Sequence, residues 1–267
     1  MQIFYIKKGD KRNMEETKLI ECFKKSEVNK ELLKLYESKW DIVDKVHEVY
    51  DKNKVYDPHT NKELSLVFHS SCVPHHYERK EMAYKKILMI GQETNGWVFR
   101  KSVKDSMLFT LGFLYSPQHN GKLSFTFPFD FCKSVNNCDY DENYRKTYFA
   151  WVSLRKFAYN EKHAYPLSSE IQNIIDNEFN ILEEEIKIIN PDIVLFLTGP
   201  DDDFYIEKQL KSVEFKAVEN YDIREFARVE HEALPKNSFR IYHPNRIRFI
   251  KEGYKKYLAS LKKECGL

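Results

Sequence analysis

Two short runs of apolar residues constrain the possible folds of this chain most strongly. The first, Ile-Leu-Met-Ile, occupies residues 87–90 and ends at Gly91. The second, Ile-Val-Leu-Phe-Leu, occupies residues 193–197 and ends before Thr198. An unbroken apolar run of this length, closed by turn residues, is typical of a strand that is buried on both faces of a parallel sheet.

The segment before the second run predicts a helix. Residues 168–189 carry apolar residues at helical spacing, Ser169 can cap the helix, and Asn190-Pro191 ends it. A helix followed by a short turn and a buried strand is the αβ unit of a parallel sheet. Residues 238–242 predict a further strand, and residues 246–263 predict a closing amphipathic helix.

The other segments complete the expected architecture. Residues 14–52 and 100–115 show helical spacing, and residues 148–157 fit a strand or a helix. Residues 213–230 suggest one or two short strands. Residues 123–131 favour a loop or sheet edge because of Pro128. We therefore expect an α/β fold, a three-layer α/β/α sandwich with a central, mainly parallel four-stranded sheet and additional N-terminal helices.

Length and composition exclude several classes of protein. A chain of 267 residues favours one domain, and its apolar content of 42% excludes wholesale disorder. The formal net charge of +2 means that any nucleic-acid surface must be a local patch. No apolar run approaches the ~18–20 residues needed to cross a bilayer, residues 1–16 lack a signal peptide, and the five cysteines show no CxxC pair. We expect a cytoplasmic monomer with reduced thiols and no membrane partner.

Polar residues follow the first predicted strand. Ligands bind at the carboxyl ends of the strands in such sheets, and the first of these ends carries Gly91, Glu93, Thr94 and Asn95. A glycine exit, a carboxylate and two hydrogen-bonding side chains suit a polar ligand pocket. The alternative is an ordinary strand-to-helix turn in which Thr94 or Asn95 only caps the next element. The spacing does not form a phosphate-binding P-loop.

A histidine follows the last predicted strand. His243 precedes Pro244, which fixes the local backbone, so its imidazole can donate or accept a hydrogen bond at a defined place. The alternative is a solvent-facing histidine at a turn. Arg246 and Arg248, with Arg240 before them, form a local basic cluster that could contact phosphates or could be a solvated helix face.

These two loops resemble the two active-site motifs of the uracil-DNA glycosylase superfamily. The match consists of Gly91-Gln92-Glu93 after the first strand and His243-Pro244-Asn245 after the last, and it looks most like a divergent bacterial branch. The resemblance covers residues 61–267, so residues 1–267 would form one such domain with residues 1–60 as a helical N-terminal extension packed on the core. It implies a glycosylase that hydrolyses the N-glycosidic bond of a deaminated or damaged base, uracil or a related one, in single- or double-stranded DNA with a flipped base, without a cofactor.

The resemblance also implies roles for individual residues. Glu93 would orient the hydrolytic water and stabilise the oxocarbenium-like sugar, and His243 would stabilise the charge that develops on the leaving base. Gln92 would offer a backbone hydrogen bond to the base. The remaining implied contacts are Gly91, Thr94, Asn95 and Ser153 around the base, one of Trp97, Phe99, Phe127 and Phe129 stacked on it, and Asn245, Arg246 and Arg248 on DNA phosphates. We expect Glu93 and His243 to line one cleft with Arg246 at its rim.

Three departures from the family pattern keep other functions open. Glu93 replaces the usual aspartate, Thr94 and Asn95 replace a proline and a tyrosine, and Ser153 or Val152 replaces the asparagine that reads the pyrimidine edge. The alternative is a non-catalytic nucleic-acid or nucleotide-binding relative with the same fold.

A third possibility is an unrelated metal-dependent hydrolase. It would use Asp201-Asp202-Asp203, although such a run more often caps a helix. The histidines and cysteine of residues 69–76 match no regular zinc spacing. We therefore expect no metal.

Overall fold

The two apolar runs form neighbouring parallel strands. The computed structural model describes residues 16–78, 84–93, 102–115, 123–136, 149–160, 166–247 and 253–267. Within it, β2 (Ile87–Gly91) pairs in parallel with β5 (Ile193–Phe196), so that Ile87 lies opposite Ile193. All residues of both strands are buried. Burial on both faces explains why neither strand shows the alternation of a half-exposed strand.

These two strands are the centre of a six-stranded sheet with the order β3-β2-β5-β8-β7-β6. β3 (Phe149–Ser153) and β8 (Asn237–Ile241) flank them in parallel, whereas β7 (Phe226–Glu230) and β6 (Glu214–Ala217) continue the sheet as antiparallel strands. The expectation of a mainly parallel sheet is confirmed, but the predicted number of four strands is wrong. Four strands are parallel, and residues 213–230 add two more, because β7 pairs with the free edge of β8 and β6 pairs with β7.

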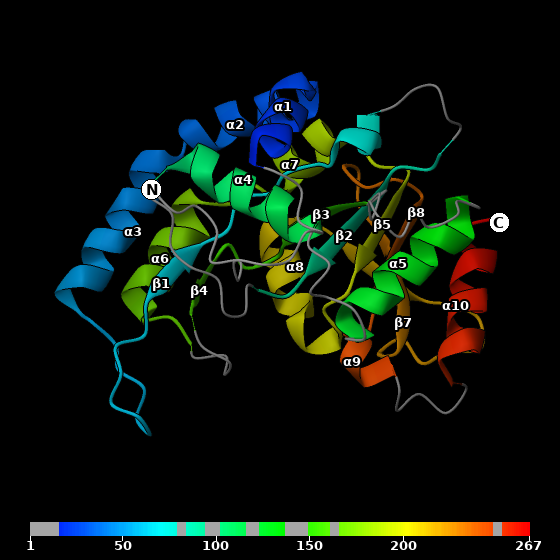
Figure 1. Cartoon of the computed structure of the whole chain (residues 1–267). Helices are drawn as coiled ribbons and strands as arrows, with labels where there is room; N and C mark the ends of the chain where they lie inside the picture. The colour runs from blue at the N-terminus through cyan, green and yellow to red at the C-terminus, as the bar shows by residue number, and fades with distance from the viewer. Residues whose placement is uncertain are drawn as a thin grey trace.

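The sheet separates two layers of helices, because alternate residues of its strands face opposite cores. Leu88 and Ile90 of β2 join one core, and Ile87 and Met89 join the other. The first core is covered by α1 (Glu16–Lys25), α2 (Glu27–Glu37), α3 (Trp40–Lys52), α4 (Val103–Leu114), α6 (Ser169–Glu178), α7 (Leu182–Ile189) and α8 (Asp203–Gln209). The second is covered by α5 (Leu123–Asn136) and α10 (Gly253–Glu264), with the short α9 (Pro244–Ile247) against α5. Figure 1 shows α5 and α10 together on one side of the sheet and α1, α2 and α3 on the other. The predicted sandwich is therefore present.

A second, smaller sheet lies among the helices of the first layer. β1 (Leu66–Phe68) pairs antiparallel with β4 (Phe157–Tyr159), and all six residues are buried. Two short 3₁₀ helices, η1 (His75–Glu78) and η3 (Pro200–Asp202), complete the described elements. None of the described helices has the length and apolar character needed to cross a membrane.

The helix predicted over residues 168–189 is two helices. α6 ends at Glu178 and α7 begins at Leu182, and the junction residues Phe179 and Ile181 are both fully buried. The cap is also one residue earlier than predicted, because the Oγ of Ser168 accepts a hydrogen bond from the backbone N–H of Ile171 at 3.3 Å. Burial of the junction thus interrupts an apolar pattern that is continuous in the sequence.

The loop or edge predicted over residues 123–131 is a helix, α5, with Pro128 inside it. A proline within a helix costs about 3 kcal/mol through the lost hydrogen bond and the ring clash. Phe127 and Phe131, four positions apart, are fully buried on the same face of α5. Burying two such rings contributes about 1.5–3 kcal/mol each, which is enough to offset the proline.

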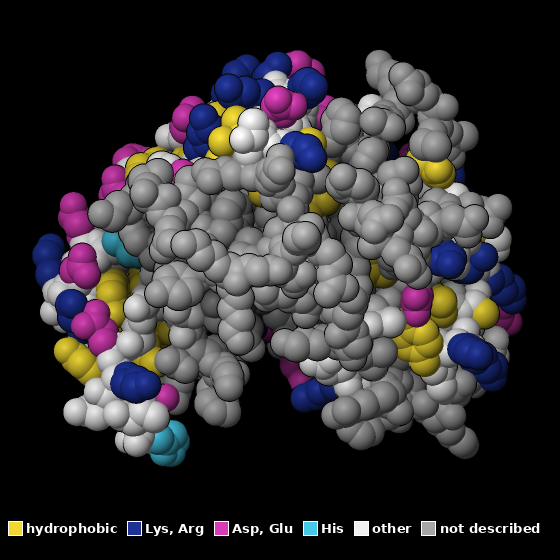
Figure 2. All heavy atoms as spheres, in the orientation of Figure 1, with side chains coloured by type: hydrophobic (Ala, Val, Ile, Leu, Met, Phe, Trp, Pro, Cys, Tyr) yellow, Lys and Arg dark blue, Asp and Glu magenta, His cyan; other side chains and the backbone are white. Residues whose placement is uncertain are grey.

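Charges of both signs are mixed on the outer helices. Figure 2 shows Lys and Arg side chains next to Asp and Glu side chains over α2 and α3. Within α2, Lys30 pairs with Glu27 and Lys34 pairs with Glu31. This part of the surface therefore does not form the local basic patch that a nucleic acid would need.

Candidate functional site

The carboxyl ends of three parallel strands meet at one pocket. Gln92 follows β2, Thr198 follows β5, and His243 follows β8, and these strands are neighbours in the sheet. The pocket is lined by Gln92, Thr198, Gly199, Pro200, Asp201, Tyr242, His243, Asn245 and Arg246. We call it the His243 pocket. Four residues to which the resemblance gives roles, Gln92, His243, Asn245 and Arg246, thus come together at the sheet edge where ligands bind in such folds.

His243 is held as a neutral hydrogen-bond donor. Its Nδ1 accepts a hydrogen bond from the backbone N–H of Asn245 at 3.3 Å. Partial burial lowers the pKa of His243, the negative charge of Asp202 opposes that shift, and the positive charge of Arg246 adds to it. The imidazole is therefore neutral at pH 7, and since Nδ1 is the acceptor, the proton is on Nε2.

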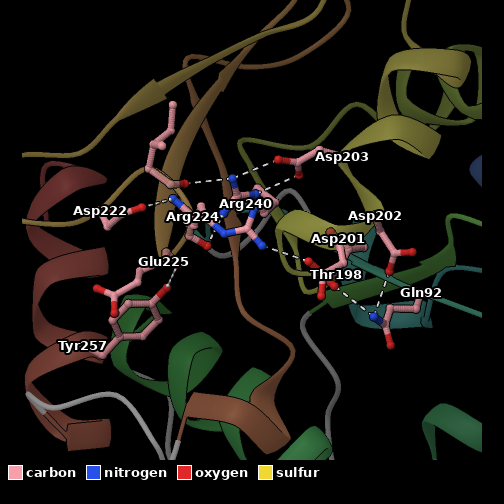
Figure 3. A network of polar contacts seen from close by, with 11 residues as sticks. Gln92, Thr198, Asp201, Asp202, Asp203, Asp222, Arg224, Glu225, Arg240 and Tyr257 are labelled. Atoms are coloured by element: carbon pink, nitrogen blue, oxygen red, sulfur yellow. Dashed lines mark hydrogen bonds and ion pairs between the residues drawn. The ribbon is translucent and has the colours of Figure 1, made fainter.

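The side-chain amide of Gln92 is fixed by two acceptors. Its Nε2 donates to the carbonyl oxygen of Thr198 at 2.9 Å and to Oδ2 of Asp202 at 2.8 Å (Figure 3). Neither partner has a proton to donate, so the amide nitrogen must lie at this end of the side chain. The hydroxyl of Thr198 is buried and has no hydrogen-bond partner among the described residues.

Arg155 joins two carboxylates beside this pocket. Its Nη1 lies 3.1 Å from Oδ1 of Asp202, and its Nε lies 3.1 Å from Oε2 of Glu93. The guanidinium also stacks on the ring of Tyr205, 4.9 Å from the ring centroid. Burial raises the pKa of Glu93, the charge of Arg155 lowers it, and the charge of Asp202 raises it. Arg155 therefore favours the ionised form of a carboxylic acid that its surroundings tend to neutralise.

Glu93 lines a second pocket, next to the first. Arg155, Lys156, Tyr205 and Lys208 are among the other lining residues. Asp202 connects the two pockets, since one of its oxygens binds Gln92 and the other binds Arg155. In the described part of the chain, Glu93 and His243 thus line two neighbouring pockets, where the sequence predicted a single cleft. Arg246 lies with His243, as expected.

Gly91 and Ser153 lie side by side at the ends of β2 and β3. A Cβ on Gly91 would be 2.5 Å from Cζ2 of Trp151, so the glycine makes room for the indole. Ser153 is buried, and its hydroxyl has no partner among the described residues. Neither residue lines the two pockets described above.

Several residues that the sequence singled out have other positions. Thr94, Asn95, Trp97, Phe99 and Arg248 lie outside the described residues. Of the aromatic residues considered for base stacking, Phe127 is buried in the core, and Phe129 packs against Phe149 with 5.3 Å between ring centroids.

Arg240 is a structural residue. Its side chain is 1% exposed and donates to both carboxylate oxygens of Asp203, at 2.9 and 3.0 Å, and to the carbonyl oxygens of Ile223 and Arg224 (Figure 3). The prediction that Arg240 belongs to a basic cluster on phosphates is therefore wrong. Arg246 is exposed, and its Nη1 lies 3.7 Å from Oδ2 of Asp201.

The three consecutive aspartates have separate partners. Asp201 pairs with Arg224, Asp202 with Arg155 and Gln92, and Asp203 with Arg240. They do not converge as a magnesium site requires. No group of three His, Cys, Asp or Glu side chains is placed to hold a metal ion anywhere in the described ranges.

Sequence reasoning missed Arg155 and the role of Asp202. Arg155 comes two residues after β3, and its backbone N–H donates to the carbonyl oxygen of Gln92 at 2.9 Å. The available signal was its position at the same sheet edge as Gln92, but residues 148–157 fitted a helix as well as a strand.

No protein-family model matches the chain, and no curated protein matches it. The described edge of the sheet offers a neutral imidazole donor, an oriented amide and an exposed arginine around one pocket. A carboxylate paired with Arg155 lies in the neighbouring pocket.

Proposed function

We propose that the protein hydrolyses the N-glycosidic bond of a deaminated or damaged base, uracil or a related one, in DNA. The observation that supports this most is the state of His243, a neutral imidazole with Nδ1 occupied by the Asn245 N–H, in a pocket whose other lining residues include the exposed Arg246. A donor of this kind stabilises an oxygen that becomes negative. An arginine beside the pocket suits a phosphate of the DNA backbone.

The proposed reaction breaks the bond between C1′ of the deoxyribose and the base nitrogen. The bonding electrons leave with the base, and the charge gathers on its carbonyl oxygen, which accepts the hydrogen bond from Nε2–H of His243. The sugar develops oxocarbenium character, which the carboxylate of Glu93 stabilises. Water adds to C1′, Glu93 takes its proton, and the base anion is protonated from solvent.

Arg155 suits this role of Glu93. Glu93 must be ionised to accept a proton from water; burial raises its pKa, and the charge of Arg155 opposes that shift. The contact of 3.1 Å between Nε of Arg155 and Oε2 of Glu93 favours the ionised form. Arg155 is thus a positioning residue, which acts on the substrate through Glu93.

One observation favours a second candidate function. The same ion pair occupies one oxygen of Glu93 and places this carboxylate in the pocket next to that of His243. A non-catalytic relative that binds a nucleic acid or nucleotide would keep the His243 pocket and would not need Glu93 to approach a sugar. Binding without cleavage distinguishes this candidate.

A gel assay for abasic sites tests the glycosylase proposal against the non-catalytic alternative. Oligonucleotides that carry uracil, hypoxanthine or xanthine, single- and double-stranded, are incubated with the protein in the presence of EDTA. We expect cleavage after alkali, reduced about 10²–10⁴-fold in Glu93→Gln and about 10²–10³-fold in His243→Gln. Glu183→Gln is the matched control and should cleave like the parent protein, because Glu183 is a half-buried glutamate of α7 that pairs with Lys187, away from both pockets.

Two results would contradict the proposal. Cleavage that survives in Glu93→Gln would remove Glu93 from the reaction. Failure to cleave any lesion, with retained binding to the same oligonucleotides, would assign the protein to the non-catalytic class.

A further inference from the structure

α10 presents four lysines on one side of the helix. They are Lys255, Lys256, Lys262 and Lys263, which we call the α10 lysine face. Residues seven positions apart lie almost in line along a helix, so the four lysines form two pairs that are about 10 Å apart along the axis. Glu264, the one acidic residue between Gly253 and the end of α10, pairs with Arg228 of β7 at 2.8 Å. No carboxylate of α10 itself therefore lies within the α10 lysine face.

These lysines differ from those of the opposite helical layer in their partners. Lys255, Lys262 and Lys263 make no ion pair with any residue that the structure describes. On α2, in contrast, Lys30 pairs with Glu27. Figure 2 shows Lys and Arg side chains over α10, on the right-hand side of the view. The α10 lysine face is thus a local positive patch on a chain whose formal net charge is only +2.

The stability of α10 does not explain the whole face. Lys262 and Lys263 lie in the last turn, where cations interact favourably with the helix dipole. Lys255 and Lys256 lie near the start of the helix, where the dipole disfavours cations, and the first turn contains no acidic residue. Two cations that destabilise their own helix favour an anionic partner outside it.

The anion that suits this face is a nucleic-acid backbone. Helices that bind membranes place large apolar side chains beside their lysines, but Tyr254, Tyr257, Leu258 and Leu261 of α10 all pack on the second core. One strand of a duplex advances 3.4 Å per nucleotide, so the two pairs of lysines match phosphates about three nucleotides apart.

α10 extends from the pocket edge of the sheet to the opposite edge. α9, which carries Asn245 and Arg246 of the His243 pocket, contacts α5, and so does α10 (Figure 1). At the other end of α10, the carbonyl oxygen of Cys265 accepts a hydrogen bond from Nδ2 of Asn237, the first residue of β8, at 3.4 Å. The lysines therefore lie along one flank of the molecule, outside the His243 pocket.

We propose that the α10 lysine face binds the phosphate backbone of the DNA that flanks the base held at the His243 pocket. The inference rests on the proposed function, because that function supplies DNA as the substrate. Contacts to phosphates carry no sequence information. The α10 lysine face thus holds undamaged and damaged DNA equally, and recognition of the base is left to the pocket.

The salt dependence of DNA binding tests this inference. Fluorescence anisotropy with the full chain measures affinity for an undamaged duplex, and for the same duplex with one uracil, over a series of salt concentrations. In the triple variant Lys255→Gln, Lys262→Gln, Lys263→Gln we expect both duplexes to bind about 10–100-fold more weakly at about 0.1 M salt. The slope of log K against log salt concentration should become less negative by about 2–3, because each lost phosphate contact contributes about 0.9.

Two matched variants separate the face from net charge and from the fold. The triple variant Lys30→Gln, Lys34→Gln, Lys45→Gln removes the same charge from lysines that are paired with glutamates, and its slope should equal that of the parent. Lys255→Arg, Lys262→Arg, Lys263→Arg keeps the charge and should also keep the slope. Equal losses in the two glutamine variants, or a loss in the arginine variant, would overturn the inference.

The outcomes distinguish this inference from the proposed function. An unchanged slope in the α10 glutamine variant, or weaker binding of the uracil duplex alone, would overturn the inference even if abasic sites are formed. The expected loss of slope in a protein that forms no abasic sites would support the inference and contradict catalysis. A parent protein that binds neither duplex would overturn the inference and leave the proposed function without its substrate. Binding to vesicles of phosphatidylserine and phosphatidylcholine in that case would assign the face to a membrane.

Discussion

The absence of a side chain at Gly91 allows Trp151 of the neighbouring strand to pack against β2. Gly91 is the last residue of β2 and lies opposite Ser153 of β3. The indole of Trp151, on that same neighbouring strand, occupies the space where a Cβ of residue 91 would be. Glycine is therefore required at this position by close packing against a neighbour.

Replacing Gly91 tests this packing. Gly91→Ala would place Cβ 2.5 Å from Cζ2 of Trp151, so we expect a loss of about 1–3 kcal/mol in the free energy of unfolding in urea. Trp151→Phe removes the clashing atom, and Gly91→Ala should cost much less in that background. An equal cost in both backgrounds would show that the indole is not the reason for the glycine.

The titration of His243 gives a second prediction at this scale. Because burial lowers the pKa of His243, the folded protein should hold the imidazole neutral down to a pH below 6.5, the ordinary value for histidine. Arg246 contributes to this lowering, so Arg246→Gln should raise the pKa of His243. Activity that needs the neutral imidazole should be lost as the pH falls through this pKa, and the loss should occur at higher pH in Arg246→Gln.

The His243 pKa can be read from the imidazole carbon-bound proton by NMR. Arg224→Gln is the control, because this substitution also removes a positive charge that pairs with Asp201 at the same edge of the sheet. A parent pKa above 6.5, or equal values in the parent and Arg246→Gln, would contradict the assigned electrostatics.

At single positions, the sequence predicted which residues lie at the end of a strand. It did not predict their contacts with residues of other segments. Gln92 follows an apolar run and His243 follows the strand predicted over residues 238–242, so their place at the sheet edge could be predicted from the sequence. Glycine is needed at position 91 because the side chain of Trp151 lies against it, and the side chain of Gln92 is oriented by its hydrogen bond to Asp202. Both contacts join segments that are far apart in the sequence, and no local pattern indicates them.

Between elements, a buried polar cluster joins two helices to the sheet region. Glu185 of α7 is fully buried, and its Oε1 binds Nζ of Lys156 at 2.5 Å and the hydroxyl of Ser71 at 3.1 Å. The same oxygen accepts a hydrogen bond from the hydroxyl of Tyr36 in α2. Lys156 is 3% exposed and lies between β3 and β4. Burial lowers the pKa of Lys156, and the charge of Glu185 opposes that shift.

Breaking this pair from one side should be costly. Lys156→Met leaves the carboxylate of Glu185 buried without its cation, and we expect a loss of about 3–5 kcal/mol in the free energy of unfolding. The double variant Lys156→Met with Glu185→Leu should recover most of this loss, because no charge remains buried. Lys187→Met, which breaks the exposed pair with Glu183 on the same helix, should leave stability nearly unchanged. Additive effects in the double variant would mean that the two side chains are not coupled.

Element boundaries were predictable where they depend on local chemistry. Asn190 adopts a left-handed conformation with φ 47° and ends α7 directly before Pro191, as the sequence predicted. The break between α6 and α7 and the helical state of residues 123–136 depend on burial of Phe179, Phe127 and Phe131. Packing of this kind overrides the local preferences that proline and helical periodicity express.

In the whole molecule, the two helical layers are explained by side chains that alternate between the two faces of the sheet. An apolar run does not show this alternation, because all its residues are apolar. β2 and β5 are apolar throughout, yet successive residues enter different cores, and each core needs its own layer of helices. The α/β sandwich could therefore be predicted from two buried strands. The two antiparallel strands could not be placed, because β6 is mostly exposed and carries no apolar run.

The N-terminal helices belong to one of these cores. Buried side chains from α1, α2 and α3 join the same cluster as Leu88 and Ile90 of β2, and they are Leu19, Phe23, Leu32, Tyr36, Val43, Val46 and Tyr50. Burying a large apolar side chain contributes about 1.5–3 kcal/mol, so these seven together contribute about 10–20 kcal/mol. The net stability of a domain is only about 5–15 kcal/mol.

Removal of residues 1–53 should therefore abolish cooperative folding. We expect residues 54–267 to lose the urea transition that the whole chain shows by circular dichroism, because the exposed face of the first core would have no cover. Removal of residues 1–15 alone keeps all seven side chains and is the matched control. A cooperative transition of residues 54–267 at the same urea concentration would show that α1, α2 and α3 are an appendage, and that the remaining helices and the sheet form a complete core without them.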